Sequence, residues 1–390
     1  MSYRLDEKDY SIFMKLYEDP FQSYNSISKL VNLAPATVKD RMEKMKQNGF
    51  LRADTKIKDP VFGSRMKSEL VAEYRPESIG LKRVNVLFEF IENETALRKI
   101  TKFCDLHPYT HYRGLILKNS INLFTQFDMP SDAEGTLEKA LQELKHELDF
   151  KSYNIVKTDE IYHTYPDFSM WSGFKRNWEP LQQGDGADEF IVDTMWNDFV
   201  ANDHELIPNT DNGEHHKYTM STLEAKLLRE LTINAKVPLQ FLSETYDRSK
   251  SVLSRNLKNL RENVIYRGHL LYDDSFFGLN NFQVIFGKFN KHSKLTSETL
   301  NSFLKNTSLP LTSTMYYNNE TFVLETVTSP ILSTEFAKFI WENTDPKHFS
   351  LNQLHIPNTM LYFFYHENYL GNDQWVEDEE KVIWEPLANI

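Results

Sequence analysis

Cysteine is almost absent from this sequence, because Cys104 is the only one in 390 residues. An intramolecular disulfide is therefore impossible, and a zinc site built on several thiolates is excluded. Glycine is also scarce, with 13 residues, and no glycine-rich phosphate-binding loop occurs. No uncharged apolar run reaches the roughly 18 residues of a membrane span, and the charged N-terminus lacks the apolar stretch of a signal peptide. We therefore predict a cytoplasmic protein of a reducing compartment, without a membrane partner.

The net charge of −12 is concentrated in two segments. Residues 182–219 hold nine acids against one lysine, and residues 366–390 hold seven acids against one lysine. The other 327 residues together carry +2. Local charge decides nucleic-acid binding, so the acidic total does not exclude such a partner for the rest of the chain. The apolar share of 40% is ample for packed cores.

Two parts of the chain are similar to each other. Residues 12–52 match residues 227–267 at an offset of 215, with apolar positions opposite apolar positions and no gap. The segments RPESIGL (75–81) and DDSFFGL (273–279) match at an offset of 198, and VNVLFEFI and FQVIFGKF continue in that register. The tetrapeptide WEPL occurs at 178–181 and again at 384–387. We interpret these matches as a tandem duplication in which WEPL ends each copy.

Each copy begins with the apolar period of three short helices. The first copy predicts helices at 9–17, 26–31 and 36–48, and the second predicts them at 222–234, 239–246 and 250–263. Two helices, a tight turn and a third helix form the helix-turn-helix arrangement. In the first copy, residues 50–59 and 65–74 favour β-structure and flank PVFG, which predicts a hairpin wing. The wing of the second copy is predicted to be short.

The period then changes to strands and helices in the order βαββαβ. The first copy predicts strands at 84–91, 112–117, 121–127 and 152–162 with helices at 94–105 and 135–148, and the second predicts strands at 282–290, 312–317, 321–327 and 349–360 with helices at 296–305 and 332–343. The fold class is therefore α+β, with two winged helix-turn-helix domains and two ferredoxin-like domains in tandem. The predicted domains are winged helix-turn-helix 1 (1–75), ferredoxin-like domain 1 with its WEPL tail (76–181), an acidic linker with one amphipathic helix (182–219), winged helix-turn-helix 2 (220–272), and ferredoxin-like domain 2 with its WEPL tail (273–390).

These features resemble the Lrp/AsnC family of transcription regulators. The stretch LDEKDYSIFMKLYEDPFQSYNSISKLVNLAPATVKDRMEKMKQNGFL is similar to the N-terminal domain of that family, and RPESIGL and DDSFFGL are similar to its hinge. The βαββαβ unit resembles its effector-binding, dimer-forming domain. The resemblance implies a sequence-specific binder of double-stranded DNA that pairs through its sandwich domains, often with a small-molecule effector such as an amino acid.

Two departures from the family pattern change what the resemblance implies. The turns Lys118-Asn119-Ser120 and Asn318-Asn319-Glu320 lack the glycine found in the ligand-side turn of the family, which argues against amino-acid sensing. Because two copies are joined, one chain would form an intramolecular pseudo-dimer by itself, and a homodimer is the open alternative.

The third helix of the second copy is predicted to be the better DNA reader. Its apolar stripe of Leu253, Leu257 and Leu260 leaves a cationic opposite face, whereas Asp40 and Glu43 stand on the corresponding face of the first copy. The predicted DNA-binding residues are Ser249, Lys250, Ser251, Arg255, Lys258 and Asn259 in the second copy, Lys39, Arg41 and Lys44 on the third helix of the first copy, and Lys56, Lys58, Arg65 and Lys67 on the first wing. The same residues also fit ordinary solvated faces, and the acidic face of the first copy also fits protein–protein contact.

No catalytic motif is evident in the sequence. His107 and His111 are four residues apart, but Pro108 lies between them and no third ligand is evident, so we predict no metal and no cofactor. We therefore predict a regulator that is not an enzyme. Two alternatives stay open: a siroheme decarboxylase-like enzyme, because some relatives of this architecture resemble such enzymes, and a protein-interaction scaffold. The enzyme would use a cluster of His107, His111, Tyr112 and Arg113, which the second copy lacks.

Overall fold

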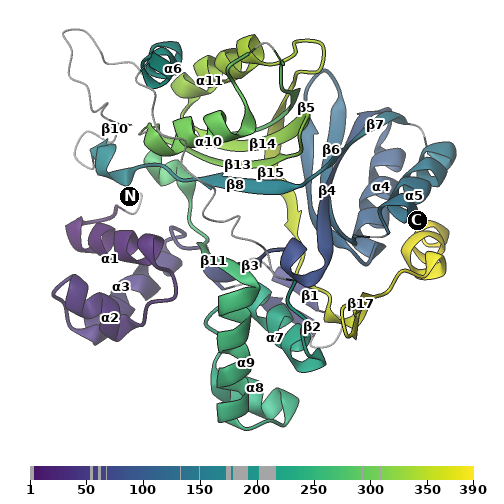
Figure 1. Ribbon diagram of the computed structural model, residues 1–390. Helices are drawn as coiled ribbons and strands as arrows, with labels where there is room; N and C mark the ends of the chain where they lie inside the picture. The colour runs from purple at the N-terminus through teal and green to yellow at the C-terminus, as the bar shows by residue number, and fades with distance from the viewer. Residues whose placement is uncertain are drawn as a thin grey trace. The chain divides into compact units, whose positions relative to one another are not determined.

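The chain forms two compact units. The computed structural model describes residues 4–52, 56–59, 63–66, 68–131, 133–148, 150–172, 177–178, 192–201, 217–291, 293–307 and 309–390. Unit 1 contains residues 1–80, 216–273 and 362–376, and unit 2 contains residues 81–215, 274–361 and 377–390. The fold class is α+β, with two winged helix-turn-helix domains and two ferredoxin-like domains, as predicted (Figure 1). Within the described ranges, no helix is both long enough and apolar enough to cross a membrane.

The first helix-turn-helix, in unit 1, comprises α1 (Glu7–Glu18), α2 (Tyr24–Leu30) and α3 (Pro35–Gln47). A capping box begins α1, because the Asp6 carboxylate accepts from backbone N–H groups of the first turn and the Asp9 side chain accepts from the Asp6 N–H. Pro35 begins α3, where its missing N–H costs nothing. The buried positions recur every three or four residues on α1 and α3, as the sequence pattern predicts.

The second helix-turn-helix, also in unit 1, comprises α7 (Thr222–Ile233), α8 (Leu239–Tyr246) and α9 (Lys250–Asn263). Asp247 has a φ of 49°, the left-handed conformation that turns the chain between α8 and α9. Ser249 caps α9, with its hydroxyl accepting from the Val252 N–H at 3.4 Å. The buried stripe of α9 is Leu253, Leu257 and Leu260, as predicted.

The first wing differs from the predicted hairpin of residues 50–59 and 65–74. A shorter hairpin forms from β1 (Lys56–Asp59) and β2 (Gly63–Met66). The remaining strand, β3 (Leu70–Tyr74), pairs antiparallel with β11 (Ile265–Leu270), which follows α9. The partner of β3 is therefore almost 200 residues away in the chain, and local turn signals contain no information about such a pairing.

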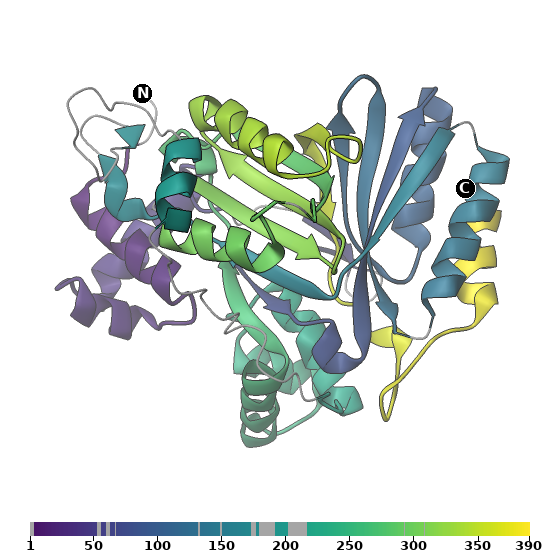
Figure 2. The ribbon, with the colours of Figure 1, turned by 45° about the horizontal axis from the view of Figure 1, so that its top comes forward.

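The two ferredoxin-like halves lie in unit 2. Their elements are β4 (Leu81–Ile91), α4 (Glu94–Leu106), β5 (Thr110–Leu117), β6 (Ile121–Pro130), α5 (Glu134–Glu147) and β7 (Phe150–Lys157) in the first half, and β12 (Asn281–Lys288), α10 (Ser297–Asn306), β13 (Leu311–Tyr317), β14 (Thr321–Thr328), α11 (Pro330–Asn343) and β15 (Ser350–Leu361) in the second. Figure 2 shows α4 and α5 on the outer side of the first half, and α10 and α11 on the outer side of the second.

The halves join into one nine-stranded sheet of order β7-β4-β6-β5-β15-β12-β14-β13-β8. The predicted strand at 152–162 is two strands, because the chain leaves β7 and continues as β8 (Glu160–Thr164). β8 pairs with β13, and β15 pairs with β5. Counting β8 as the last strand of the first half, the last strand of each half therefore pairs with the second strand of the other half. The apolar interior between the halves contains Leu87, Phe124, Val284 and Phe286.

The sequence alignment of the two halves, at an offset of 198, is wrong by one residue in the first strand of each half. Asn85 faces the interior, where the Gln126 amide donates to it at 3.0 Å. Gln283, which the offset of 198 matches to Asn85, faces the outer helices and donates to Ser333 on α11 at 3.4 Å. One additional residue after the second hinge shifts the strand, and a shift of one residue moves every side chain to the other face. The common origin of the two halves stays a prediction.

The tryptophans of the two WEPL segments lie in different structures. Trp178 lies in a hairpin of β9 (Trp171–Ser172) and β10 (Asn177–Trp178), and its indole donates to the Phe277 carbonyl at 2.7 Å. Its counterpart is Trp375, in a hairpin of β16 (Tyr369–Gly371) and β17 (Gln374–Trp375), whose indole donates to the Ile79 carbonyl at 3.1 Å. Ile79 and Phe277 are matching residues of the two hinge segments.

The second WEPL lies instead in a C-terminal helical segment, formed by η6 (Glu380–Trp384) and α12 (Glu385–Ala388). Its buried residues are Val382, Ile383, Pro386 and Leu387. The amphipathic helix predicted in the acidic segment is present as α6 (Val192–Ala201), with Val192, Trp196 and Phe199 in the core of the second half. The recurrence of WEPL is therefore not evidence for a repeat, and residues 179–181 lie outside the described ranges.

Candidate functional sites

The outer face of α9 is the first candidate site, and it is cationic. Lys250, Arg255 and Lys258 are exposed on this face, and Ser249 and Ser251 are exposed at its N-terminal end. Arg255 makes no ion pair within the described part of the chain, so its charge faces solvent. The helix has 14 residues and is therefore about 21 Å long, which suits the major groove of a duplex.

Several of the predicted DNA-binding residues at α9 have partners within the protein. The hydroxyls of Ser249 and Ser251 lie 3.1 Å apart. The Asn259 amide donates to the carboxylate of Glu224 on α7 at 3.2 Å, and its side chain is half-buried. Lys258 forms an ion pair with Glu262 one turn later, at 3.6 Å. The pair with Glu262 is exposed and therefore weak, so it does not prevent Lys258 from contacting a phosphate. Asn259 has a structural contact that fixes it against α7.

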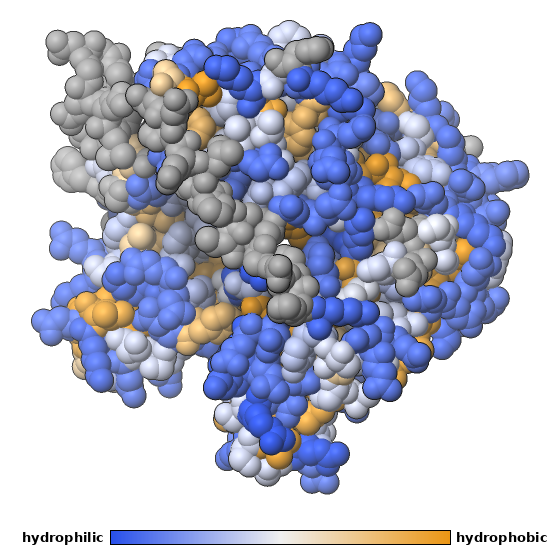
Figure 3. Space-filling model, in the orientation of Figure 1, coloured by the Kyte–Doolittle hydropathy of each residue, from blue (hydrophilic) through white to orange (hydrophobic). Residues whose placement is uncertain are grey.

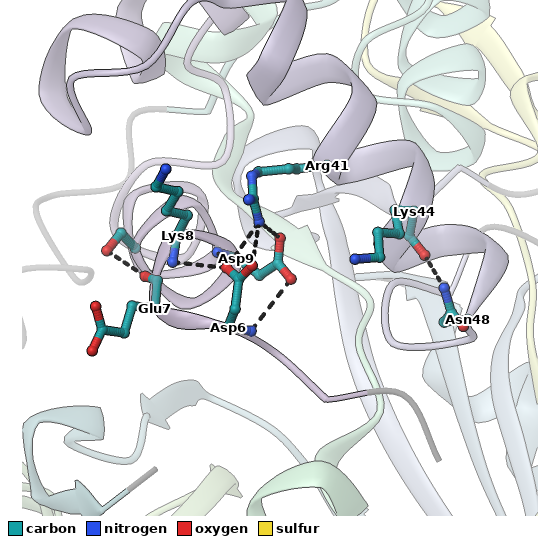
Figure 4. A network of polar contacts seen from close by, with 8 residues as sticks. Asp6, Glu7, Lys8, Asp9, Arg41, Lys44 and Asn48 are labelled. Atoms are coloured by element: carbon teal, nitrogen blue, oxygen red, sulfur yellow. Dashed lines mark hydrogen bonds and ion pairs between the residues drawn. The ribbon is translucent and has the colours of Figure 1, made fainter. Parts of the chain in front are cut away.

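The corresponding face of α3 has a different charge pattern. Lys39 and Lys44 are exposed beside Asp40 and Glu43, so positive and negative charges alternate there. Arg41 is held in a network with two carboxylates of the α1 cap (Figure 4). Its guanidinium lies 2.8 Å from Asp6 and 2.6 Å from Asp9, and the side chain of Asp9 is 0% exposed. Burial by itself raises the pKa of Asp6. Hydrogen bonds from Arg41 and from backbone amides lower the pKa, and together they outweigh burial, so the net shift is downward.

The predicted wing residues are placed only in part. Lys56 and Lys58 lie on β1, and Arg65 lies on β2, but their side chains are outside the description. Lys67 lies outside the described residues altogether. Figure 3 shows mainly hydrophilic side chains around α9 and an apolar patch over α2, the helix that contains the exposed Leu30.

A buried polar network in unit 2 is the second candidate site. Arg83 on β4 donates twice to Asp128 on β6, at 2.8 and 2.9 Å, and the two residues are only 5% and 3% exposed. The His111 imidazole lies 3.2 Å from the same carboxylate. The Asp128 carboxylate therefore lies between a guanidinium and an imidazole.

The network continues across the interior to the second half. Asn85 donates to Thr158 at 2.8 Å, and the Gln126 amide donates to Asn85 and to Glu325 on β14, the latter at 2.9 Å. Burial raises the pKa of Tyr112 well above its usual value, and the charge of Glu325 adds to this effect. These groups can hold and orient a polar ligand between the halves, or they can serve only to fix the pairing of the halves.

Most of this polar network belongs to the first half. Arg83, Asn85 and Asp128 project into the interior, whereas the interior positions of β12 and β14 that correspond to them hold Phe282, Val284 and Val327. Among the corresponding positions of β12 and β14, Glu325 is the polar one, and it matches Gln126. The interior is therefore chemically asymmetric, although the strand order is the same in both halves.

The predicted cluster of His107, His111, Tyr112 and Arg113 does not form. His107 is buried against the rings of Phe103 and Phe127 on the helix side of the sheet, and burial lowers its pKa to about 3. Arg113 pairs with Asp105 at 2.8 Å. Only His111 and Tyr112 belong with the interior network. Alternation predicts the sides that strand residues face, but a bulge in β5 between Thr110 and Tyr112 interrupts this alternation.

Sequence reasoning missed the network around Arg83, although a signal for it exists. Polar and apolar residues alternate in Arg83-Val84-Asn85 and again in Gln126-Phe127-Asp128. Polar residues at every second position of a predicted buried strand indicate a face that is both polar and enclosed. Within the described ranges, no three His, Cys, Asp or Glu side chains are grouped as metal ligands.

The comparisons with known proteins bear on both candidate sites. A family model described as winged helix-turn-helix DNA-binding matches residues 5–52. A crystal structure of the siroheme decarboxylase NirDL is similar over 98% of this chain and 99% of that chain, with 10% identity and a TM-score of 0.53. NirDL in co-complex with an iron-uroporphyrin III analogue gives 9% identity, the same coverage and a TM-score of 0.54.

A further solved structure, AsnC of E. coli, is similar over 40% of this chain and 94% of that chain, with 18% identity and a TM-score of 0.30. No curated protein matches the chain. The N-terminal region is thus a winged helix domain of the DNA-binding type, and the likeness to NirDL shows a shared fold along the whole chain.

The prediction that the chain is not an enzyme is wrong. It rested on the absence of a recognisable motif and on the family resemblance. The fold that this chain shares over nearly its full length with NirDL is the fold of an enzyme. The architecture is therefore compatible with catalysis, and absence of a linear motif is weak evidence when interior residues come from separate strands.

Proposed function

We propose that this protein is a DNA-binding transcription regulator whose principal contact with double-stranded DNA is the outer face of α9. The observation that supports this proposal is the exposed row of Lys250, Arg255 and Lys258 on the third helix of a helix-turn-helix domain. The winged helix match at residues 5–52 supports the same function for the first domain. The two halves act as an intramolecular pseudo-dimer, because their last strands pair with each other's second strands.

Duplex binding by such a face is mainly electrostatic. Each lysine or arginine that contacts a phosphate releases a counterion, so the affinity falls as the salt concentration rises. Arg255 is in the second turn of α9, from which a side chain reaches base edges in other proteins of this arrangement. Arg41 is not part of the proposed contact, because Asp6 and Asp9 hold it.

Mapping of the genomic DNA bound by the protein in cells, followed by titration of a recovered duplex in vitro, tests the proposal. Arg255→Glu replaces a cation by an anion on the proposed face and is expected to lower affinity by about 1–3 kcal/mol, roughly 5- to 150-fold. Lys226→Glu is the matched control, because Lys226 is an exposed lysine on α7 of the same domain and lies outside α9. Its expected effect is less than about 3-fold.

Two results would contradict the proposal. One is the absence of any enriched DNA with the wild-type protein. The other is an equal loss of affinity for Arg255→Glu and Lys226→Glu, which would mean that only overall charge matters.

The second candidate function is an enzyme that acts on siroheme or a related tetrapyrrole with several carboxylates. The observations that favour it are the full-length fold likeness to NirDL and the buried network of Arg83, Asp128 and His111. An arginine and a histidine enclosed between the halves are suitable partners for substrate carboxylates. Tyr112, with its raised pKa, would remain protonated and could donate a hydrogen bond or a proton.

Absorbance spectroscopy with siroheme tests this second candidate. Binding is expected to shift the absorbance spectrum of the tetrapyrrole, and His111→Ala is expected to weaken the shift. His348→Ala is the control, because His348 is exposed and pairs with Asp345 outside the network. An unchanged spectrum on mixing with the wild-type protein would remove this candidate and leave the first proposal untouched.

A further inference from the structure

We infer that one chain recognises a non-palindromic duplex, with its two helix-turn-helix domains fixed to each other and contributing unequally. This inference rests on the proposed DNA-binding function. It adds the class of DNA target, which follows from how unit 1 is built and from where its charges lie.

The two helix-turn-helix domains are tied together by a shared ribbon of two strands. β3 pairs with β11 over the residues from Leu70 to Tyr74. Glu73 on β3 accepts hydrogen bonds from Tyr266 and from Arg267 on β11, the latter at 2.6 Å, and its carboxylate also contacts His269. A carboxylate held by several groups of the opposite strand fixes the pairing register of the ribbon.

Next to the ribbon, a side chain of the second domain packs into the apolar core of the first domain. The ring of Tyr272, from the second domain, packs against Phe13, Tyr17 and Phe50 of the first, with ring centroids 5.2 to 6.2 Å apart. Arg52 pairs with Asp273 at 3.1 Å. Because an aromatic side chain of one domain completes the apolar core of the other, the two domains move as one body.

A second set of contacts lies away from the ribbon. The ammonium of Lys236, which follows α7, donates to the Gln22 carbonyl between α1 and α2 at 3.1 Å and lies 5.6 Å from the ring centre of Tyr24. The guanidinium of Arg261 on α9 lies 5.3 Å from the ring centre of Phe21. The segment between α1 and α2 therefore also contacts the second domain, which further fixes the position of one domain against the other.

The two domains differ in the charge they offer to DNA. The exposed face of α9 presents Lys250, Arg255 and Lys258, with Glu262 only in its last turn. The exposed face of α3 alternates Lys39 and Lys44 with Asp40 and Glu43. Carboxylates near phosphates weaken binding, so a palindrome would place one of its identical half-sites against the face of mixed charge. An asymmetric target, with its specific bases opposite α9, avoids that cost.

Selection of bound sequences from a pool of random duplexes with the full-length chain tests the inference. The expected motif lacks dyad symmetry, and sedimentation of the complex is expected to show one chain per duplex. Arg255→Glu is expected to lower affinity for the selected duplex by about 10-fold or more, whereas Lys39→Glu lowers it by less than about 3-fold. Lys226→Glu again controls for overall charge.

The contradicting results distinguish failure of this inference from failure of the proposed DNA-binding function. A palindromic motif occupied by two chains, or equal losses for Arg255→Glu and Lys39→Glu, would overturn the inference while leaving the regulator intact. Enrichment of no duplex at all would overturn both.

Discussion

The guanidinium of Arg41 lies between two carboxylates of the α1 cap, and this placement decides what the residue does. From the sequence, Arg41 is one of the three α3 cations that are candidate phosphate contacts. In the structure it neutralises Asp9, whose side chain is fully buried, and joins α3 to the start of α1. Counting the cations of a helix face therefore overestimates the charge available to a ligand when one of those cations pairs with carboxylates of a neighbouring helix.

Arg41→Ala is predicted to destabilise the protein by about 1–3 kcal/mol, because it leaves the buried Asp9 carboxylate without its cation. Chemical denaturation followed by far-UV circular dichroism measures the change. Asp6→Asn is the matched control, because Asp6 is about half exposed and asparagine also caps helices well. A loss for Asp6→Asn as large as that for Arg41→Ala would contradict the account.

The buried His107 is predicted to make stability depend on pH. Its pKa in the folded protein is about 3, because burial disfavours the charged ring, and an unfolded histidine titrates near 6.5. Between these values the unfolded chain binds the additional proton, so stability is lost as the pH falls below about 6.5. The expected loss from this group between pH 7 and pH 5 is about 2 kcal/mol.

The His107→Asn variant isolates that effect. Asparagine does not titrate, and its carbonyl can replace the ring nitrogen that accepts from the Tyr109 N–H at 3.2 Å. The wild-type protein should therefore lose about 2 kcal/mol more than the variant between pH 7 and pH 5 in urea denaturation. Parallel pH profiles for the two proteins would show that His107 is accessible to protons in the folded state.

At the scale of elements, the helices could be predicted from the sequence and the partners of the strands could not. The stripe of Leu253, Leu257 and Leu260 follows from a local period, and all three residues are buried as expected. The pairing of β3 with β11, and the continuation of β7 into β8 beside β13, depend on residues far apart in the chain. Sequence similarity between the halves also placed the first strand one residue out of register.

Element packing also explains why the recurring tetrapeptide misled the sequence comparison. Trp178 and Trp375 are structural counterparts that bind matching hinge carbonyls, although the residues after them differ. Trp384 is followed by the same three residues as Trp178, but it lies in the C-terminal helical segment and is partly exposed. Identity of four letters says less about structure than a shared hydrogen-bond partner.

Trp375→Phe and Trp178→Phe are each predicted to destabilise the protein by about 1 kcal/mol or more, because each leaves a hinge carbonyl without its donor. Trp384→Phe removes an indole near Lys139 and should cost less. Thermal denaturation of the three variants gives the comparison. If Trp384→Phe proved the most destabilising of the three, the assignment of Trp375 as the counterpart of Trp178 would lose its support.

At the scale of the whole molecule, the order of elements is repeated and the chemistry is not. The third helix of one helix-turn-helix is cationic and that of the other has mixed charge, and the interior positions of β4 and β6 are polar where most of those of β12 and β14 are apolar. The sequence reveals the unequal helices, because a helix face can be read from spacing alone. It does not reveal the unequal interior, because the residues involved come from separate strands whose register has to be known first.

The dependence of duplex affinity on salt concentration tests the central claim most directly. If α9 contacts phosphates, a plot of log affinity against log salt falls linearly, and the slope becomes shallower by about 1 in Lys250→Gln, which removes one cation from the α9 face. The Lys226→Gln control should retain the wild-type slope. Affinity that does not change with salt, or a slope that is the same in Lys250→Gln and the wild-type protein, would contradict the assignment of α9 as the DNA-contacting face.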